Sequence, residues 1–429
     1  MADTKIKMTL RKPATAKTTA AQPDTSPTKS EAVRKLIAHA KQVNGHFIDR
    51  ERMVTHLLLG VVSRTNVLLF GPPGVAKTEV VDAVVSAFAA RDDVYSTLLT
   101  KYTTPDEILG PVDLKAYEAG TLSRMTSGYM PSARVAVVDE IFKGSSAILN
   151  ALLSLSNERR IRIGAGWVQT KLRMIVGMSN EYPEDAKVLG AFYDRYPAKH
   201  IARYLDDGGF RRLLTLRSAG GSKFSPQTII TSEDLEAIDT QYAAVTFSPE
   251  ALDAVCEFRA NLMRQKIVPS DRRWMAALGI ARAAALLKGK ATVDVPTLRV
   301  LACCLWTREE EIPKIEEEIN RVAAPESSEI KRASAFIAES MRKMQSDCGT
   351  SGGRPDLQKV GEFAARNVTT FRALQDKMNG LNAAGMGQEE AEELALVKAQ
   401  IADVFKLFTS IMAGGDVEGD YMRLLQVVQ

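Results

Sequence analysis

Apolar residues along this chain follow two patterns, which predict alternating strands and helices. Short, mostly apolar runs at 67–70, 135–138 and 172–178, and the β-forming stretch Tyr95–Leu99, are typical of buried strands. Elsewhere apolar residues recur every three or four positions, as on the packed face of a helix. Helices are expected on this basis at 30–44, 49–62, 80–88 and 145–155. The alternation predicts an α/β fold with a parallel sheet.

The second half of the chain reads as helical. Ser232–Leu235 and Ser248–Glu250 resemble helix starts, and a small helical lid is expected over 231–310. Beyond it, an apolar residue recurs every three or four positions along two stretches. These are Leu394, Val397, Ile401, Val404, Phe408 and Ile411, and Phe371, Leu374, Met378 and Leu381. With a third helix over 312–344, broken at Pro325, they predict a three-helix bundle within 311–429, which either docks a partner or only strengthens the structure.

The first 30 residues differ from the rest in composition. They are rich in Ala, Thr, Lys and Pro, and hold almost no large apolar groups, so we expect a disordered tail over 1–30 before a nucleotide-binding core over 31–230. The tail has six basic and two acidic residues, which accounts for the net charge of +4 of the whole chain. An arm for an adaptor or for nucleic acid is the functional alternative. The neutral body gives little support to a nucleic-acid groove.

Composition narrows the class of protein further. With 429 residues and 45% hydrophobic content, the chain can form two or three cores. No stretch is apolar enough to span a bilayer and no secretory signal is evident, so a cytoplasmic location is the default expectation. The four cysteines show no metal-binding spacing, and Cys256, Cys303 and Cys304 are expected to be buried thiols. The four histidines form no metal-binding pair either.

The stretch 71–78, Gly-Pro-Pro-Gly-Val-Ala-Lys-Thr, follows the first predicted strand and precedes a helix. It is typical of a phosphate-binding loop (Walker A), in which backbone N–H groups surround the phosphates, Lys77 contacts the β- and γ-phosphates and Thr78 ligates Mg²⁺. Ala76 replaces the last glycine of the usual pattern, a modest departure. The sequence therefore predicts an ATP and Mg²⁺ site. Its cofactor-binding residues are Gly71, Pro72, Pro73, Gly74, Val75, Ala76, Lys77, Thr78 and Glu79.

Two polar groups at strand ends are expected to complete the site. Asp139 and Glu140 end an apolar strand about sixty residues after the loop, where Asp139 would hold Mg²⁺ and Glu140 would polarise the attacking water (Walker B). Asn180 ends the next strand, where it either senses the γ-phosphate or only forms a turn.

Further segments are open to two interpretations each. His46, Phe47 and Ile48 either contact the adenine ring or pack in the core. The basic residues of a predicted hairpin, Arg159, Arg160 and Arg162, form a solvated face or, less favoured, a substrate-contacting loop. Arg272 and Arg273 open a helix, an electrostatically poor place for cations, which suggests a phosphate contact unless they form a surface pair.

In these motifs and their order, residues 31–310 resemble a MoxR-type AAA+ ATPase, closest to the RavA-like (regulatory ATPase variant) subgroup. The supporting motifs include Thr104–Glu107, Thr126–Tyr129, Leu149–Leu153, Asn157–Arg159 and Tyr193–Arg195. The resemblance implies an αβα core with a helical lid, assembled into a ring, usually a hexamer. It also implies that Asn180 is sensor 1, Arg195 an arginine finger and Arg272 or Arg273 sensor 2. Ser346–Asp356 stands where that subgroup carries an inserted partner-binding domain, so its specific partners do not carry over.

Three functions follow for comparison. The resemblance favours an ATP-hydrolysing, chaperone-like remodeler of a protein target, acting with a von Willebrand factor A partner. A nucleic-acid-associated AAA+ motor is the alternative, kept open by the hairpin arginines. A nucleotide-gated scaffold without hydrolysis is disfavoured because the full set of catalytic residues is present.

Overall fold

The computed structural model describes residues 30–88, 93–163, 166–182, 186–218, 220, 223–323, 325–348, 356–381, 388–413, 417 and 419–421. At its centre lies a sheet of five parallel strands in the order β2-β3-β6-β1-β7. These strands are β1 (Val67–Phe70), β2 (Val94–Leu98), β3 (Val135–Asp139), β6 (Met174–Ser179) and β7 (Ala198–Ile201). The four predicted strands are confirmed within two residues at each end, and β7 was not predicted. The expected disordered tail lies outside the described residues.

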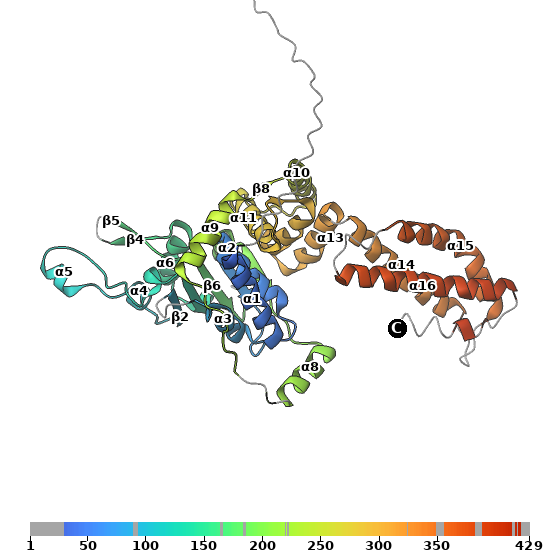
Figure 1. The fold of residues 1–429 in the computed structure, drawn as a ribbon, viewed down its shortest axis with the longest axis horizontal. Helices are drawn as coiled ribbons and strands as arrows, with labels where there is room; N and C mark the ends of the chain where they lie inside the picture. The colour runs from blue at the N-terminus through green and yellow to red at the C-terminus, as the bar shows by residue number, and fades with distance from the viewer. Residues whose placement is uncertain are drawn as a thin grey trace, which may run out of the picture.

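Helices cover both faces of this sheet (Figure 1). They are α1 (Glu31–His46), α2 (Glu51–Ser63), α3 (Lys77–Val85), α6 (Ser146–Glu158) and α7 (Ala186–Arg195). The α1 helix continues through Gly45, where a stop was expected, and α3 begins earlier than the apolar pattern indicated, within the phosphate loop. Gly60 of α2 lies so close to the sheet that a Cβ there would meet the Met174 sulfur at 2.5 Å. The α/β core is therefore tightly packed behind the site.

Two elaborations extend from the core between β2 and β6. The first elaboration holds the short helices α4 (Pro105–Leu109) and α5 (Leu114–Glu118). It is followed by two 3₁₀ turns that flank β3, η2 (Met130–Ser132) and η3 (Ile141–Lys143). The second elaboration is a hairpin of β4 (Arg160–Ile163) and β5 (Gly166–Gln169). The hairpin was predicted, but its arginines are not all solvated. Arg159 donates hydrogen bonds to Asn66 Oδ1 (2.7 Å) and to the Arg64 carbonyl (3.1 Å). Arg160 pairs with Glu158 and lies over the Trp167 ring.

A helical lid follows the core. Its elements are α9 (Ser232–Ala244), β8 (Thr246–Phe247), α10 (Pro249–Arg264), α11 (Asp271–Lys288), β9 (Thr292–Val293), η4 (Val295–Leu301), α12 (Ala302–Leu305), η5 (Glu309–Glu311) and α13 (Ile312–Ala323). Ser248, with Pro249 in the first turn, caps α10 as expected, whereas Thr231 rather than Ser232 caps α9. Ile315, Ile319 and Ala323 of α13 belong to the same core as the sheet and lid. We therefore propose that the lid extends to Ala323 rather than to 310.

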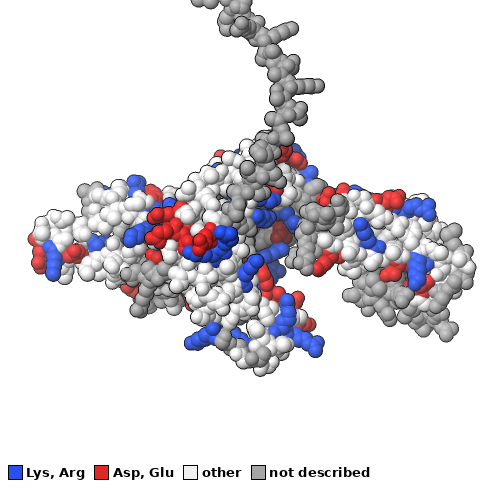
Figure 2. Space-filling model, viewed as in Figure 1, with Lys and Arg blue, Asp and Glu red and all other residues white. Residues whose placement is uncertain are grey.

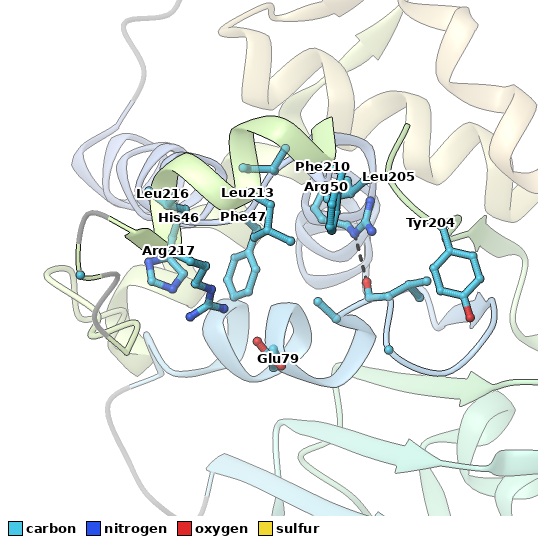
Figure 3. A pocket seen from close by; sticks show the side chains of 15 residues that line it. His46, Phe47, Arg50, Glu79, Tyr204, Leu205, Phe210, Leu213, Leu216 and Arg217 are labelled. Atoms are coloured by element: carbon cyan, nitrogen blue, oxygen red, sulfur yellow. Dashed lines mark hydrogen bonds between the residues drawn. The ribbon is translucent and has the colours of Figure 1, made fainter. Parts of the chain in front are cut away.

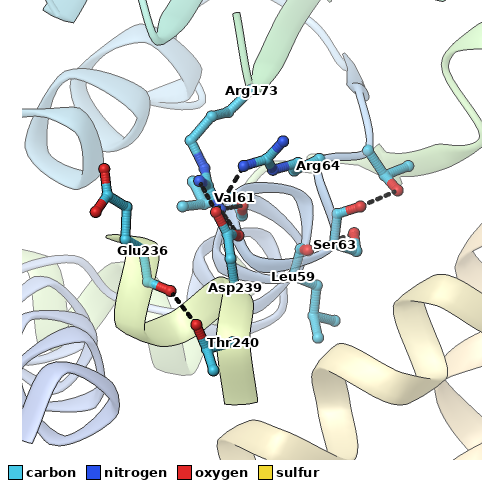
Figure 4. Close-up of polar contacts among 9 residues, drawn as sticks. Leu59, Val61, Ser63, Arg64, Arg173, Glu236, Asp239 and Thr240 are labelled. Atoms are coloured by element: carbon cyan, nitrogen blue, oxygen red, sulfur yellow. Dashed lines mark hydrogen bonds and ion pairs between the residues drawn. The ribbon is translucent and has the colours of Figure 1, made fainter. Parts of the chain in front are cut away.

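An ion cluster joins the lid to the sheet. Asp239 of α9 accepts hydrogen bonds from Arg173, which is 4% exposed and precedes β6, and from Arg64 after α2 (Figure 4). These bonds hold the pKa of Asp239 below its usual value, against the opposing effect of burial. Removing one partner of a buried ion pair lowers protein stability strongly, because it leaves the other charge buried without compensation. The cluster therefore fixes α9 to the core at this point.

The C-terminal helices form a second core, α14 (Pro325–Cys348), α15 (Leu357–Gly380) and α16 (Gln388–Ala413), which lies apart from the sheet (Figure 1). Leu394, Val397, Ile401, Val404 and Phe408 are buried in it, with Phe371 and Met378 of α15. Ile411, Leu374 and Leu381 pack against it half-buried. The predicted apolar seams and the break at Pro325 are confirmed.

The surface and the cysteines complete the description. Acidic and basic side chains are interspersed on the face in Figure 2. Cys303 and Cys304 are buried as expected, but Cys256 is exposed, because it lies on the outer side of α10. Among the described helices, none has both the length and the apolar content that crossing a bilayer requires. The described residues also contain no cluster of three His, Cys, Asp or Glu side chains suited to a metal ion.

Candidate nucleotide-binding site

The loop between β1 and α3 has the geometry of a phosphate cradle. Gly71 (φ 146°) and Gly74 (φ 79°) have positive φ angles, and a Cβ on Gly71 would lie 2.3 Å from the Ala202 carbonyl oxygen. Ala76 keeps the left-handed angle (φ 63°) that the usual glycine would supply, at a cost of about 1 kcal/mol. The departure from the usual pattern therefore leaves the loop conformation unchanged.

Three side chains at the carboxyl edge of the sheet form one hydrogen-bonded path. Lys77 Nζ donates to Asn180 Oδ1 (2.7 Å), and Asn180 Nδ2 donates to Glu140 Oε1 (2.6 Å). The parallel register explains this, since Phe70 lies opposite Ser179 and Val138 opposite Gly177, so the residues after each strand meet. The sequence predicted these three residues at one site, and the structure brings them together.

Lys77 also donates to the carbonyls of Gly71 (2.5 Å) and Pro72 (3.0 Å), so its ammonium lies inside the loop. Burial lowers the pKa of Lys77, while Asp139 and Glu140 act in the opposite direction. A buried cation held by neutral oxygens, close to two carboxylates, fits a ligand that carries phosphate and a divalent cation.

The two predicted metal ligands are Asp139 and Thr78. Asp139 accepts a hydrogen bond from the Glu140 N–H through Oδ1 (2.9 Å), and Thr78 is exposed in the first turn of α3. Both are hard oxygen donors of the kind Mg²⁺ prefers.

A cavity of about 580 Å³ adjoins the loop (Figure 3). His46, Phe47 and Ile48 line it together with Gly74, Val75, Ala76 and Glu79. Pro72 and Pro73 are not among its lining residues, although Tyr204 donates a hydrogen bond to the Pro73 carbonyl (3.2 Å). The helix α8 (Asp207–Ser218), which the sequence did not predict, also contributes residues to the lining of this cavity.

The two candidate sensor arginines have different environments. Arg273 is 5% exposed and donates to Asp194 (3.2 Å) and to Thr307 Oγ1 (2.9 Å), so it ties α11 to α7 and to the chain after α12. Arg272 is exposed, although neighbouring atoms partly shield it from water; this partial burial, followed by the nearby Arg195, lowers its pKa. Arg195 is half-buried in the last turn of α7. Arg273 is thus held inside the protein by Asp194, whereas Arg272 stays exposed near Arg195.

Two family models match the chain. Residues 34–240 match the MoxR domain in the MoxR-vWA-beta-propeller ternary systems, and residues 250–319 match an AAA lid domain. An uncharacterized protein of Methanocaldococcus jannaschii is 30% identical over 279 residues, which cover 65% of this chain and 71% of that protein. The chain belongs to the MoxR-type AAA+ ATPases.

Further relatives are similar to this MoxR-type chain over different shares of its length. A second uncharacterized protein of Methanocaldococcus jannaschii is 29% identical over 337 residues, covering 77% of this chain and 88% of that protein. Chaperone MoxR1 of Mycobacterium tuberculosis is 32% identical over 126 residues, covering 29% of this chain and 31% of its own. The solved structure of a candidate ATPase from Cytophaga hutchinsonii has a TM-score of 0.55 at 20% identity, covers 68% of this chain and 94% of its own, and supports the fold alone.

Sequence reasoning missed two buried cations of this MoxR-type chain, Arg50 beside the phosphate loop and Lys199 within β7. Arg50 is buried and donates to the Val75 carbonyl (3.1 Å) and the Arg203 carbonyl (3.0 Å), which joins the loop to the end of β7. Lys199 of β7 is 1% exposed, donates to the Cys304 carbonyl (3.1 Å), and lies within 5 Å of the Tyr193 and Trp306 ring centroids. A single Lys inside a short strand has no sequence pattern that would indicate these contacts of Lys199.

Proposed function

We propose that this MoxR-type chain binds ATP with Mg²⁺ at Gly71–Thr78, hydrolyses it, and uses the cycle to remodel a protein target as part of a ring. The path Lys77–Asn180–Glu140 is the observation that supports hydrolysis most strongly. It places a cation for the phosphates, an amide and a carboxylate base in one contact chain. A scaffold that only binds nucleotide has no need of that arrangement.

The residues would act as follows. Lys77 and the loop N–H groups bind the β- and γ-phosphates, while Thr78 and Asp139 hold Mg²⁺, which neutralises charge on the phosphates when bound. Glu140 takes up the proton of the attacking water. Asn180 orients Glu140 through its amide nitrogen. When Lys77 turns to the phosphates, the Asn180 side chain is free to face the γ-phosphate.

We further propose that Arg195 acts on the site of a neighbouring subunit and that Arg272, rather than Arg273, is sensor 2. This rests on the exposure of Arg272 beside Arg195 and on the ties of Arg273 to Asp194 and Thr307. The matched family model includes a von Willebrand factor A component in its description, which supports such a protein as the partner. The motif order supports placement near the RavA-like subgroup.

A nucleic-acid motor has less support from the structure than from the sequence. Arg159 is held by Asn66, and Arg160 is paired with Glu158, which leaves fewer hairpin cations for phosphate contacts. A salt-sensitive stimulation of ATPase activity by DNA would restore that alternative.

Two variants test hydrolysis. Lys77→Ala should abolish ATP binding, because Lys77 contacts phosphate in the ground state. Glu140→Gln should bind ATP in calorimetry yet turn it over at least tenfold more slowly, because Glu140 acts on the water in the transition state. Wild-type turnover in Glu140→Gln would show that another group is the base.

A mixing experiment tests the ring. Subunits with Arg195→Ala and subunits with Glu140→Gln are each expected to be inactive alone. Mixed rings should regain activity at interfaces that join an intact Arg195 to an intact Glu140, since a finger contributes about a thousandfold in rate. Mixed rings that form without any recovery would place Arg195 outside the neighbouring site.

A further inference from the structure

Tyr182 connects the segment that carries Asn180 to the lid. Its hydroxyl donates a hydrogen bond to Oε2 of Glu309 (3.3 Å), which lies in the 3₁₀ turn η5 of the lid. The other oxygen of Glu309, Oε1, accepts a hydrogen bond from Arg203 (2.5 Å), which follows β7. One carboxylate of the lid is therefore held by two side chains of the α/β core, and one of these stands two residues after Asn180.

The short segment between Asn180 and Tyr182 is itself hydrogen-bonded to the sheet. Its middle residue, Glu181, donates its backbone N–H to the Ser179 hydroxyl (3.2 Å), and its carbonyl accepts a hydrogen bond from the same hydroxyl (2.6 Å). Ser179 is the last residue of β6 and is 3% exposed. Because the three residues 180–182 share this tight turn, a change in the backbone at Asn180 is passed on to Tyr182.

The Tyr182 ring packs on an aromatic residue at the end of β1. It is stacked on Phe70, the residue before Gly71, with ring centroids 4.5 Å apart and planes inclined by 23°. Two further rings lie around Phe70, those of Phe142 in η3 (6.2 Å) and of Trp306 in the lid (6.3 Å), and Trp306 is 2% exposed. The start of the phosphate loop, the turn after β3, the segment 180–182 and the lid thus meet at one ring.

The contact with Glu309 is more exposed than other ties between the lid and the core. The Arg203 side chain is 72% exposed and that of Glu309 is 41% exposed. By contrast, the side chains of Arg173 and Arg273, whose ion pairs join the lid to the core, are 4% and 6% exposed. Exposed ion pairs contribute little to stability, because water competes for both partners. The buried pairs can therefore keep the lid attached while the Glu309 contact opens and closes.

We propose that Tyr182 is a positioning residue that couples Asn180 to the lid. Its hydrogen bond to Glu309 is made while Lys77 is bonded to Asn180, and it breaks when Lys77 turns to the phosphates of ATP. This inference rests on the proposed ATP site. Asn180 accepts from Lys77 at 2.7 Å, so the segment 180–182 readjusts when the ammonium moves. Such coupling is reciprocal, so the lid contact opposes ATP binding as ATP binding opposes the lid contact.

Calorimetry on the full chain with Mg²⁺ and AMP-PNP, an ATP analogue that resists hydrolysis, tests the coupling. Tyr182→Phe removes the hydroxyl and keeps the ring, so the Kd should fall about threefold, because binding no longer has to break the lid contact. Glu309→Ala removes the acceptor and should also lower the Kd. The double variant should bind no tighter than Glu309→Ala alone. Glu310→Ala removes the same charge one residue further along; it is the matched control and should keep the wild-type Kd.

Amide hydrogen exchange follows the lid contact itself. In wild type, Mg²⁺ and AMP-PNP should speed exchange in the lid segment 306–312, because η5 loses an attachment to the core. Tyr182→Phe should show this faster exchange without added nucleotide, whereas Glu310→Ala should behave as wild type. Thermal unfolding curves that coincide with wild type will show that all variants fold.

The outcomes separate this inference from the proposed function. If wild type binds AMP-PNP, and Tyr182→Phe and Glu309→Ala bind it equally well or more weakly, Tyr182 does not couple the site to the lid and only this inference is overturned. Equal gains in Glu309→Ala and Glu310→Ala would also overturn it, since the effect would follow charge and not the hydrogen bond. If wild type binds neither AMP-PNP nor ATP, the ATP site itself is wrong and both proposals are overturned.

Discussion

Nδ2 of Asn180 donates a 2.6 Å hydrogen bond to Oε1 of Glu140, while Oδ1 of the same side chain accepts one from Lys77. The Asn180 amide thus donates to the Glu140 carboxylate and accepts from the Lys77 ammonium. Substitutions at Asn180 can remove the donor and the acceptor separately. A further cation, Lys143, lies 3.4 Å from the other oxygen of Glu140.

Replacing Asn180 should separate its two contacts. Asn180→Asp keeps an acceptor for Lys77 but loses the donor to Glu140 and adds a repelling charge, so kcat should fall by about a hundredfold. Asn180→Ala loses both contacts, so its kcat should fall by a similar factor, and its Kd for ATP should change less than its kcat. Steady-state ATPase assays with calorimetry will check this. A kcat for Asn180→Asp near that of wild type would mean that Asn180 does not orient the base.

Ala76→Gly should stabilise the protein. Ala76 has φ 63°, a conformation that glycine adopts without the Cβ penalty, so the free energy of unfolding should rise by about 1 kcal/mol. Ala83→Gly, in the interior of the same helix α3, is the control and should lower that free energy by about the same amount. Denaturant unfolding of both variants measures the two changes, which must differ in sign if the strain at Ala76 is real.

Arg272 and Arg273 should separate activity from stability. Arg273→Met leaves Asp194 without its buried partner and should lower the melting temperature by several degrees. Arg272→Met removes an exposed side chain, so the melting temperature should hold while ATP turnover falls. If Arg272→Met retains full turnover and Arg273→Met, measured below its melting range, does not bind or hydrolyse ATP, the sensor assignment must be exchanged.

The buried Lys199 predicts a pH dependence of stability. Burial, with a contribution from Arg273, lowers the pKa of Lys199 to about 7, whereas the unfolded chain keeps the ordinary value of 10.5. Between these values the unfolded state binds the extra proton, so the free energy of unfolding should rise as pH increases from 7 to 10, with a slope of up to about 1.4 kcal/mol per pH unit from this group. Lys199→Met should flatten the rise, and Lys41→Met, at an exposed position of α1, should not. Parallel curves for wild type and Lys199→Met would contradict the shift.

Two truncations test where the lid ends. A chain ending at Ala323 keeps α13 and should unfold at nearly the temperature of the α/β and lid core in the full chain. A chain ending at Arg308 loses Ile315 and Ile319, which are 0% and 2% exposed in that core, so it should melt several degrees lower or aggregate. Equal melting of the two truncated chains would place α13 outside the lid.

Three of the four strands that the sequence predicted, β1, β3 and β6, have mostly continuous apolar residues, and β2 was predicted from its β-forming residues. The carboxyl ends of β1, β3 and β6 placed Lys77, Glu140 and Asn180 at one edge. The strand β7 was missed because Lys199 and His200 interrupt its apolar pattern, and its burial depends on the Tyr193 and Trp306 rings, which are distant in sequence. The helix α8 was missed because its apolar residues do not face a core.

Arg272 and Arg273 illustrate a second limit. They are adjacent, and only the position of Asp194, more than seventy residues earlier, distinguishes the buried one from the exposed one. Similarly, no local pattern indicates that Arg159 contacts Asn66 rather than solvent. Sequence patterns report which face of an element is apolar, but not which distant polar group meets a given cation.

The junction between α13 and α14 joins the lid to the second core. α13 is fixed in the lid and contacts α14, which begins at Pro325 and runs for 24 residues, or about 36 Å. A lid rotation of about 10° transmitted through this junction would sweep the far end of α14 through about 6 Å. The distance of the helical bundle from the lid would then amplify a small rotation of the lid into a displacement of about 6 Å at the far end of α14.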